Sequence, residues 1–133
     1  MILSESELKQ LIDLNIEKAF QATTEVAILI ENHLYATAVN RIYYGIFYII
    51  SALALKNNFS TSNHSQLIGW FNKTYIKNNI VDRNIGKKIH HAFKQRIEGD
   101  YNVLIQFSLE DVEDGLKDMK DIIESIHELI KKS

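Results

Sequence analysis

The stretch YATAVNRIYYGIFYIISALALK, residues 35 to 56, decides the fold of this chain. Apolar residues recur in it at spacings of three and four, which is the period of an α-helix. The stripe expected to be buried consists of Val39, Ile42, Tyr43, Ile46, Ile49, Ile50 and Leu53. A helix that is apolar nearly all round is typical of a protein core, with other helices packed around it. Its longest uncharged apolar segment, residues 42 to 55, has 14 residues and is too short to span a bilayer.

The sequence on both sides of this stretch also predicts helices. The chain has no proline and only five glycines, and we find no run of period two that would indicate a strand. Ser4 and Glu7 form a capping box that opens a first helix, which should end near residues 32–33. A third helix is expected from about His64 to Lys77, after the cap-rich run STSN.

Two further helices complete the pattern. Asp82 can cap a fourth helix, for which Gly99 is a natural stop. Ser108 and Asp111 open a fifth helix, whose apolar residues alternate at spacings of three and four. The helical spacing of apolar residues along most of the chain predicts an all-α fold. The connections between the expected helices are short, which is typical of sequential helices that pack antiparallel. We expect one domain over residues 1–133, built as an up-and-down bundle of four to five helices.

Composition narrows the possible functions and locations. The absence of cysteine excludes disulfides, thiolate metal sites and a cysteine nucleophile. The N-terminus, MILSESEL, is acidic and lacks the basic flank of a secretory signal. We therefore expect a cytoplasmic protein that does not enter a membrane.

The charges are unevenly distributed along the chain. Residues 56–96 carry eight Lys or Arg against one acid, whereas residues 97–133 carry four against ten. Acidic helices of the same bundle could neutralise this basic block. Alternatively, the block is an electrostatic footprint for phosphate or nucleic acid, and its aromatic residues, Trp70 and Phe93 among them, favour that interpretation.

The segment KQRIEGDY, residues 94 to 101, places a charge where an apolar residue is expected. Arg96 lies three residues after Phe93 and seven after Ile89, so it falls inside the apolar stripe of its helix. A guanidinium in that position has to be paired, and Asp100, four residues on, is the nearest candidate. The pair is either a structural link that orients Tyr101 or a sheltered arginine that receives a phosphate.

Two helix faces carry polar groups that the core does not explain. The second helix presents Asn40, Arg41, Tyr44, Tyr48 and Ser51 away from its core stripe. Such a face contacts another helix, a partner subunit or a ligand. The fourth helix forms a basic ridge opposite its apolar stripe, made of Arg83, Lys87, His90, His91 and Lys94.

Metal-binding patterns are nearly missing from the sequence. Glu124 and His127 make a single Glu-x-x-His, which is half of the motif of di-iron bundles. Such a site needs two of these pairs and two further glutamates on the inside of the bundle. We predict no metal and no cofactor.

Three segments together resemble a known family. They are YATAVNRIYYGIFYIISALALK, then SNHSQLIGWFNKTYIK, and then the helix that ends in FKQRIEGDY. They look like the small stand-alone bacterial branch of the HEPN family (higher eukaryotes and prokaryotes nucleotide-binding). The similarity extends over roughly residues 5 to 130, and its most specific parts are AVNRIYY at 38–44, His64 and residues 96–101.

The resemblance implies a helical bundle that forms a homodimer and is often paired with a minimal nucleotidyltransferase as toxin and antitoxin. HEPN toxins are generally metal-independent ribonucleases whose motif is an arginine followed, four to six residues later, by a histidine. Arg96 matches the arginine, but residues 101–103 contain no histidine. Some family toxins are silenced by adenylylation of a nearby tyrosine, and Tyr101 is the candidate here.

These observations predict a protein that binds or acts on RNA or nucleotides. Arg96, Asp100 and Tyr101 form the candidate catalytic group. The candidate phosphate or nucleic-acid ligands are Arg41, Tyr44, His64, Lys87, His91 and Lys94. The alternative is a non-enzymatic helical module that binds a protein partner.

Overall fold

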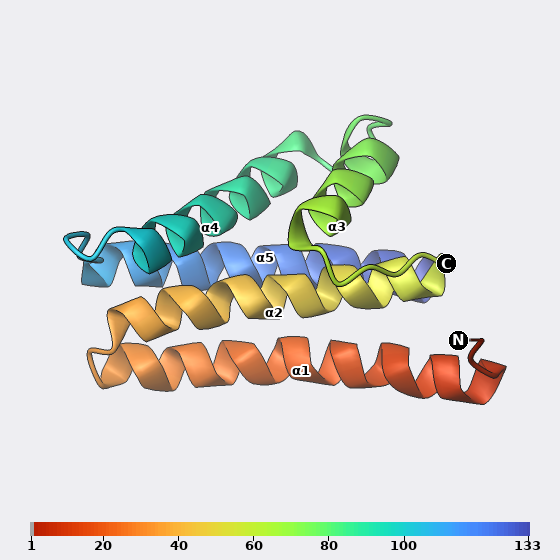
Figure 1. Cartoon of the computed structure of the whole chain (residues 1–133), viewed down its shortest axis with the longest axis horizontal. Helices are drawn as coiled ribbons and strands as arrows, with labels where there is room; N and C mark the ends of the chain where they lie inside the picture. Colours follow the sequence, from red (N-terminus) through yellow and green to blue (C-terminus); the bar gives the residue numbers. More distant parts are fainter. Residues whose placement is uncertain (1) are drawn as a thin grey trace.

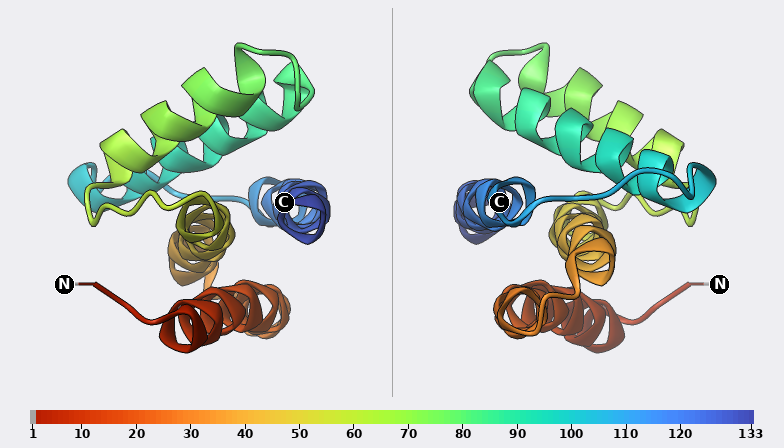
Figure 2. Two further views of the ribbon diagram at one scale, coloured as in Figure 1. Left: turned by 90° about the vertical axis from the view of Figure 1, so that its right-hand side faces the viewer. Right: turned by 90° about the vertical axis from the view of Figure 1, so that its left-hand side faces the viewer.

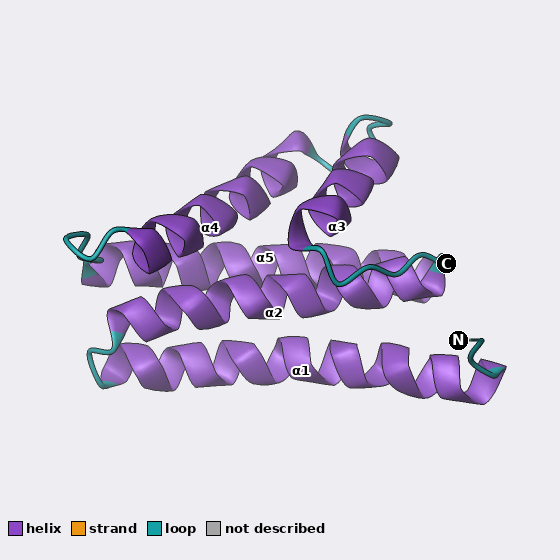
Figure 3. Ribbon diagram, viewed as in Figure 1, coloured by secondary structure: helices purple, strands orange, loops and turns teal. Residues whose placement is uncertain are grey.

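The computed structural model describes residues 2–133. Its helices are α1 (Glu5–Glu31), α2 (Tyr35–Lys56), α3 (His64–Phe71), η1 (Asn72–Ile76), α4 (Arg83–Tyr101) and α5 (Leu109–Lys132). The segment η1 is one π-helical turn that continues α3. Loops join the helices, and residues 2–133 contain no strand, which confirms the all-α prediction (Figure 3).

The bundle consists of a base of three helices and a pair that crosses it. Helices α1, α2 and α5 form the base, and α2 also contacts α3 and α4 (Figure 1). The end-on views place α3 and α4 on the side of α2 that faces away from α1 (Figure 2). The predicted bundle is therefore confirmed, although the α3–α4 pair is tilted across the base.

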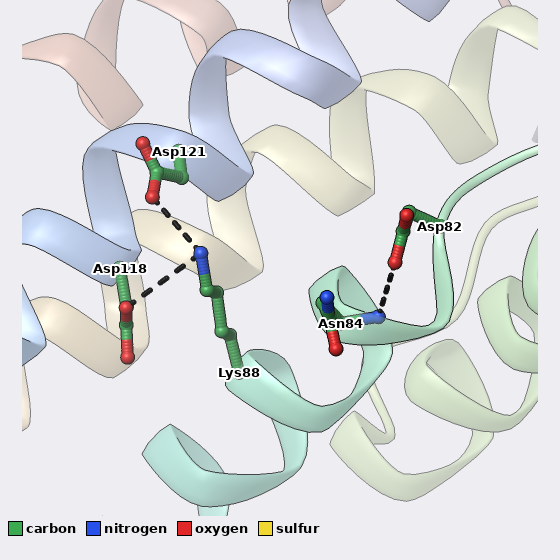
Figure 4. A network of polar contacts seen from close by, with 5 residues as sticks. All are labelled: Asp82, Asn84, Lys88, Asp118 and Asp121. Carbon is green, nitrogen blue, oxygen red and sulfur yellow. Dashed lines mark hydrogen bonds and ion pairs between the residues drawn. The ribbon is translucent and has the colours of Figure 1, made fainter.

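Capping side chains begin the helices where the sequence predicts. Both capping boxes form, with Ser4 and Glu7 at α1 and Ser108 and Asp111 at α5. Within the run STSN it is Asn63 that accepts the backbone N–H of Gln66. Asp82 accepts the N–H of Asn84 at 2.7 Å and begins α4 (Figure 4).

The stripe of α2 forms the centre of the core, and all seven of its predicted residues are buried. Gly45 lies where α2 approaches both neighbours of the base. A Cβ atom there would overlap the side chain of Met119 and lie 3.0 Å from the Cβ of Ala22. Glycine thus allows the three base helices to pack closely at this level.

The fourth helix is longer than the sequence predicts. The expected stop at Gly99 is wrong, because α4 continues to Tyr101 and is capped by Asn102, whose N–H bonds the carbonyl of Glu98. Gly99 has no positive φ angle, so it does not act as a left-handed helix stop. The two additional helical residues place Asp100 one turn after Arg96, within ion-pair distance.

One helix, α2, is long and apolar enough to cross a membrane by length and composition. In the folded chain, 61% of its most apolar window is buried inside the bundle. The same burial is expected of the core helix of a globular protein.

Candidate functional site

Arg96 occupies a sheltered position between α4 and α2. Its side chain is 24% exposed, and its Cζ lies 5.0 Å from the ring centre of Tyr43 and 5.5 Å from that of Tyr44. A guanidinium over aromatic rings gains cation–π attraction, which grows as water is removed. The two tyrosines therefore provide a surface that keeps the charge of Arg96 in one place.

Asp100 supplies the countercharge from the next turn of the same helix. Its Oδ2 lies 3.4 Å from Nε of Arg96, which is an ion pair at (i, i+4) spacing. The alignment is poor, since the buried Nε finds no hydrogen-bond acceptor within residues 2–133. The hydroxyl of Tyr44 lies 3.5 Å from Nη2, at the outer limit of a hydrogen bond. Arg96 is thus neutralised without being fully hydrogen-bonded.

A small hollow opens beside this pair. Its volume is about 260 Å³, and its lining is Ala36, Thr37, Val39, Asn40, Arg96, Gly99 and Asp100. The first turns of α2 contribute a hydroxyl and an amide group, and α4 contributes the ion pair. These groups include hydrogen-bond donors suited to an oxyanion.

His64, at the start of α3, joins the cluster through Tyr43. Its Nδ1 lies 2.7 Å from the hydroxyl of Tyr43, and its ring lies 4.1 Å from that of Phe47. Burial, and secondarily the charge of Arg96, lower the pKa of His64 below its ordinary value. Burial raises the pKa of Tyr43 to about 12. At neutral pH the imidazole of His64 and the phenol of Tyr43 are therefore both uncharged, and the tautomer of His64 decides which of the two groups donates the hydrogen bond.

The structure thus brings together four of the predicted residues. Asp100 and Tyr44 each contact Arg96, and His64 is linked to Arg96 through Tyr43. These residues come from three helices.

The other predicted residues lie elsewhere. Arg41 pairs with Glu25 of α1 at 3.0 Å, so it contributes to the contact between α1 and α2. Tyr101 is 84% exposed at the end of α4. Lys94 lies 3.9 Å from Glu98, and His91 is exposed on α4. Lys87 lines a different groove, between α4 and η1.

The acidic helix α5 neutralises only part of the basic block. Lys88 bonds Asp121 at 2.9 Å and lies 3.8 Å from Asp118, across the contact of α4 with α5 (Figure 4). Lys73, Lys77, Arg83 and Lys87 form no ion pair with any of residues 2–133. Neutralisation by an acidic helix is therefore confirmed for Lys88, and the interpretation of the block as a phosphate or nucleic-acid footprint stays a prediction.

The Glu-x-x-His of Glu124 and His127 is not part of a metal site in the described residues. His127 packs its ring edge against Phe20, with centroids 5.3 Å apart. No group of three or more metal-ligating side chains occurs in the part of the chain that the structure describes.

Sequence reasoning missed two features of the site. Tyr43 was expected only in the core, yet its hydroxyl links His64 to the arginine. A tyrosine in a stripe of isoleucines is a usable signal, because a buried hydroxyl needs a partner. Thr37 lines the hollow beside Asn40, which the sequence placed on the polar face of the second helix, but no sequence feature indicated Thr37.

Comparison with known proteins identifies the family. The sequence matches the HEPN domain over residues 12–129. A "UPF0332 protein" of Thermotoga maritima is 32% identical over 95% of this chain and 96% of its own length. In Methanocaldococcus jannaschii, "Putative toxin MJ0142" is 34% identical over 80% of this chain and 70% of its own length. "Putative toxin MJ0605" of the same organism is 31% identical over 71% of this chain and 76% of its own length. The similarity seen in the three sequence segments is thereby confirmed, and the chain belongs to the HEPN domain family.

Proposed function

We propose that this chain is a toxin-like HEPN protein that binds RNA by holding a backbone phosphate at Arg96. The names of two relatives, which both contain the word toxin, support the first part. The geometry around Arg96 supports the second.

The observation that carries the proposal is a fixed and partly desolvated guanidinium beside a hollow. Two tyrosine rings and Asp100 hold Arg96, and the hollow adds Thr37 and Asn40 as polar neighbours. Asp100 lies against Nε, which leaves the terminal nitrogens of the guanidinium for an oxyanion. Arginine binds phosphate through such paired N–H groups, and it stays charged at every physiological pH.

The same geometry favours holding a phosphate over cleaving RNA. Cleavage requires a group that accepts a proton from the attacking hydroxyl. His64 is the histidine of the cluster, and its Nδ1 is already hydrogen-bonded to the hydroxyl of Tyr43. In the tautomer in which Nδ1 accepts that bond, Nε2 carries the proton and cannot act as a base.

We also propose that the functional form is a homodimer. Large apolar side chains are exposed shortly after Asp100 in the chain, with Val103 at 94% and Leu104 at 86%. Ile97, one residue after Arg96, is also exposed on α4. Exposed apolar side chains gathered beside a site are typical of an interface. Two copies joined there would place their arginine sites close to each other.

A minimal nucleotidyltransferase is the partner that the family resemblance favours. Tyr101 follows Asp100 directly, and its exposed hydroxyl is accessible to a modifying enzyme in the single chain. An adenylyl group there would add a negative charge close to Arg96 and oppose phosphate binding.

Incubation of the purified protein with a mixed RNA pool, with and without EDTA, tests the proposal when both the bound fraction and the length of the RNA are measured. Arg96→Ala is compared with Lys120→Ala, which removes one exposed positive charge from α5. We expect wild type and Lys120→Ala to bind RNA alike and leave it intact, and Arg96→Ala to bind at least tenfold more weakly.

Two outcomes would change the conclusion. EDTA-resistant cleavage that Arg96→Ala abolishes would make the chain a ribonuclease whose base comes from another residue. RNA binding that is equal in wild type and Arg96→Ala would exclude the arginine site. The alternative would then be a module that binds a protein partner.

A further inference from the structure

A second basic surface lies between α4 and the end of the α3–η1 segment. It is a groove of about 770 Å³, with a lining of Gly69, Asn72, Lys73, Ile76, Lys77, Arg83, Gly86, Lys87 and His90. Five of these nine residues are basic, and none is acidic. None of them belongs to the Arg96 cluster.

The positive charges occur on both walls of the groove. Lys73 and Lys77 are four residues apart at η1, and Arg83 and Lys87 are four residues apart on α4. On α4, four residues correspond to about one turn, or roughly 6 Å along an α-helix. Each wall therefore presents two cations.

These cations are available to a ligand. None of the four Lys and Arg residues forms an ion pair with any of residues 2–133. Asp82, which precedes Arg83, uses its carboxylate to accept the N–H of Asn84. Four unpaired cations around one groove produce a positive potential that attracts polyanions.

Local backbone features shape the groove. At η1 the N–H of Lys77 bonds the carbonyl of Asn72 at 2.8 Å, an i→i+5 bond of the kind often found at functional sites. A Cβ at Gly69 would meet no atom within 4 Å, so this position leaves the groove free of side chains. At Gly86 a Cβ would lie 3.3 Å from Ile76, so glycine allows η1 to approach α4 there.

We propose that this groove binds the phosphodiester backbone of a single-stranded nucleic acid, independently of its sequence. Unpaired cations on two facing walls can contact successive phosphates of a backbone. A protein partner would need aromatic or large apolar anchors, and Ile76 is the one large apolar side chain in the lining of this groove. The inference goes beyond the Arg96 site and does not depend on it.

The groove nevertheless leads toward that site. His90 lines the groove, and Phe93, one helical turn later, contacts the ring of Tyr43 at 5.7 Å. Tyr43 in turn lies against Arg96. A single-stranded nucleic acid bound in the groove would therefore be close to the arginine cluster.

The test measures binding of a fluorescein-labelled oligouridylate by anisotropy over a series of salt concentrations, with EDTA present. The groove variants are Lys73→Glu/Lys77→Glu and Arg83→Glu/Lys87→Glu. The matched control is Lys117→Glu/Lys120→Glu on α5, which makes the same change in net charge. Circular dichroism verifies that all variants are helical.

We expect each groove variant to bind at least tenfold more weakly at low salt, while the control stays within about twofold. On single strands, each phosphate contact makes the slope of log affinity against log salt steeper by about 0.7. Each groove variant removes two cations, so its slope should be shallower than that of wild type by about 1.4. Equal losses in groove and control variants, or no binding of RNA, would overturn the inference. Polyglutamate that competes as well as the RNA would overturn it in favour of an acidic protein partner.

Arg96→Ala in the same assay separates the two proposals. If the groove variants lose binding and Arg96→Ala does not, the groove inference is supported and the proposed phosphate site fails. If only Arg96→Ala loses binding, the groove inference fails and the proposed function is supported.

Discussion

The chain holds two groups of positive charge that differ in their surroundings. Arg96 is largely withdrawn from water and is held by two tyrosine rings and one carboxylate. The groove cations are on the surface and make no ion pair within residues 2–133. A charge taken out of water must be held by partners, whereas surface charges are mobile and screened by salt. A fixed cation such as Arg96 is therefore suited to positioning one phosphate. The surface cations of the groove are suited to attracting a nucleic-acid backbone independently of its sequence.

The largest difference between the two regions should appear in stability. Tyr43 is 1% exposed and joins α2 to α3 and α4, so Tyr43→Ala removes a buried ring and leaves a cavity. Replacing a buried aromatic residue by alanine costs about 3–5 kcal/mol. Lys87→Ala in the groove should leave the midpoint of urea unfolding almost unchanged. If Lys87→Ala shifted the midpoint as much as Tyr43→Ala, the groove would be part of the structural core.

Asp100→Asn sharpens the comparison by changing the charge of the Arg96 site alone. Asparagine keeps an oxygen near Nε, but it removes the negative charge that opposes an incoming phosphate. We expect affinity for oligouridylate to rise by between about 1.4-fold and fivefold, since partly exposed pairs interact by only about 0.2–1 kcal/mol. If the groove binds the RNA backbone as proposed, the salt dependence should stay the same, because the variant leaves the groove cations unchanged. Weaker binding by Asp100→Asn would mean that the carboxylate is needed to orient the arginine.

Much of the fold could be predicted from the sequence, because helix caps and the spacing of apolar residues depend only on residues that are close together in the chain. The two capping boxes and the stripe of α2 needed no tertiary information. The end of α4 was predicted incorrectly. Glycine usually ends a helix in a left-handed conformation, but Gly99 stays helical while Asp100 pairs with Arg96.

The candidate site could be predicted only in part, since it depends on how helices meet. Arg96 and Asp100 are neighbours on one helix, so their spacing alone indicated a pair. The contacts of Tyr43 and His64 join residues 21 positions apart, and no local pattern encodes them. The groove likewise combines η1 with α4, and the sequence showed its charges only as a basic block.

The smallest expected effect is a change in the pKa of His64. It tests whether the charge of Arg96 acts on this histidine while the groove cations do not. Burial, and secondarily Arg96, lower the pKa of His64, so Arg96→Gln should raise that pKa part of the way toward its ordinary value. The groove variant Lys87→Gln serves as the control and should leave it unchanged. Titration of the imidazole signals by NMR measures both.

The same shift fixes the direction of a pH effect on stability. Because the folded chain has the lower pKa at His64, the unfolded chain binds more protons as the pH falls through the ordinary histidine range. The stability that neutral His64 contributes is therefore complete above that range and is lost as the pH falls through the folded pKa. Arg96→Gln should lose less of it on acidification than wild type does. An equal loss in both would mean that burial alone, without the charge of Arg96, controls His64.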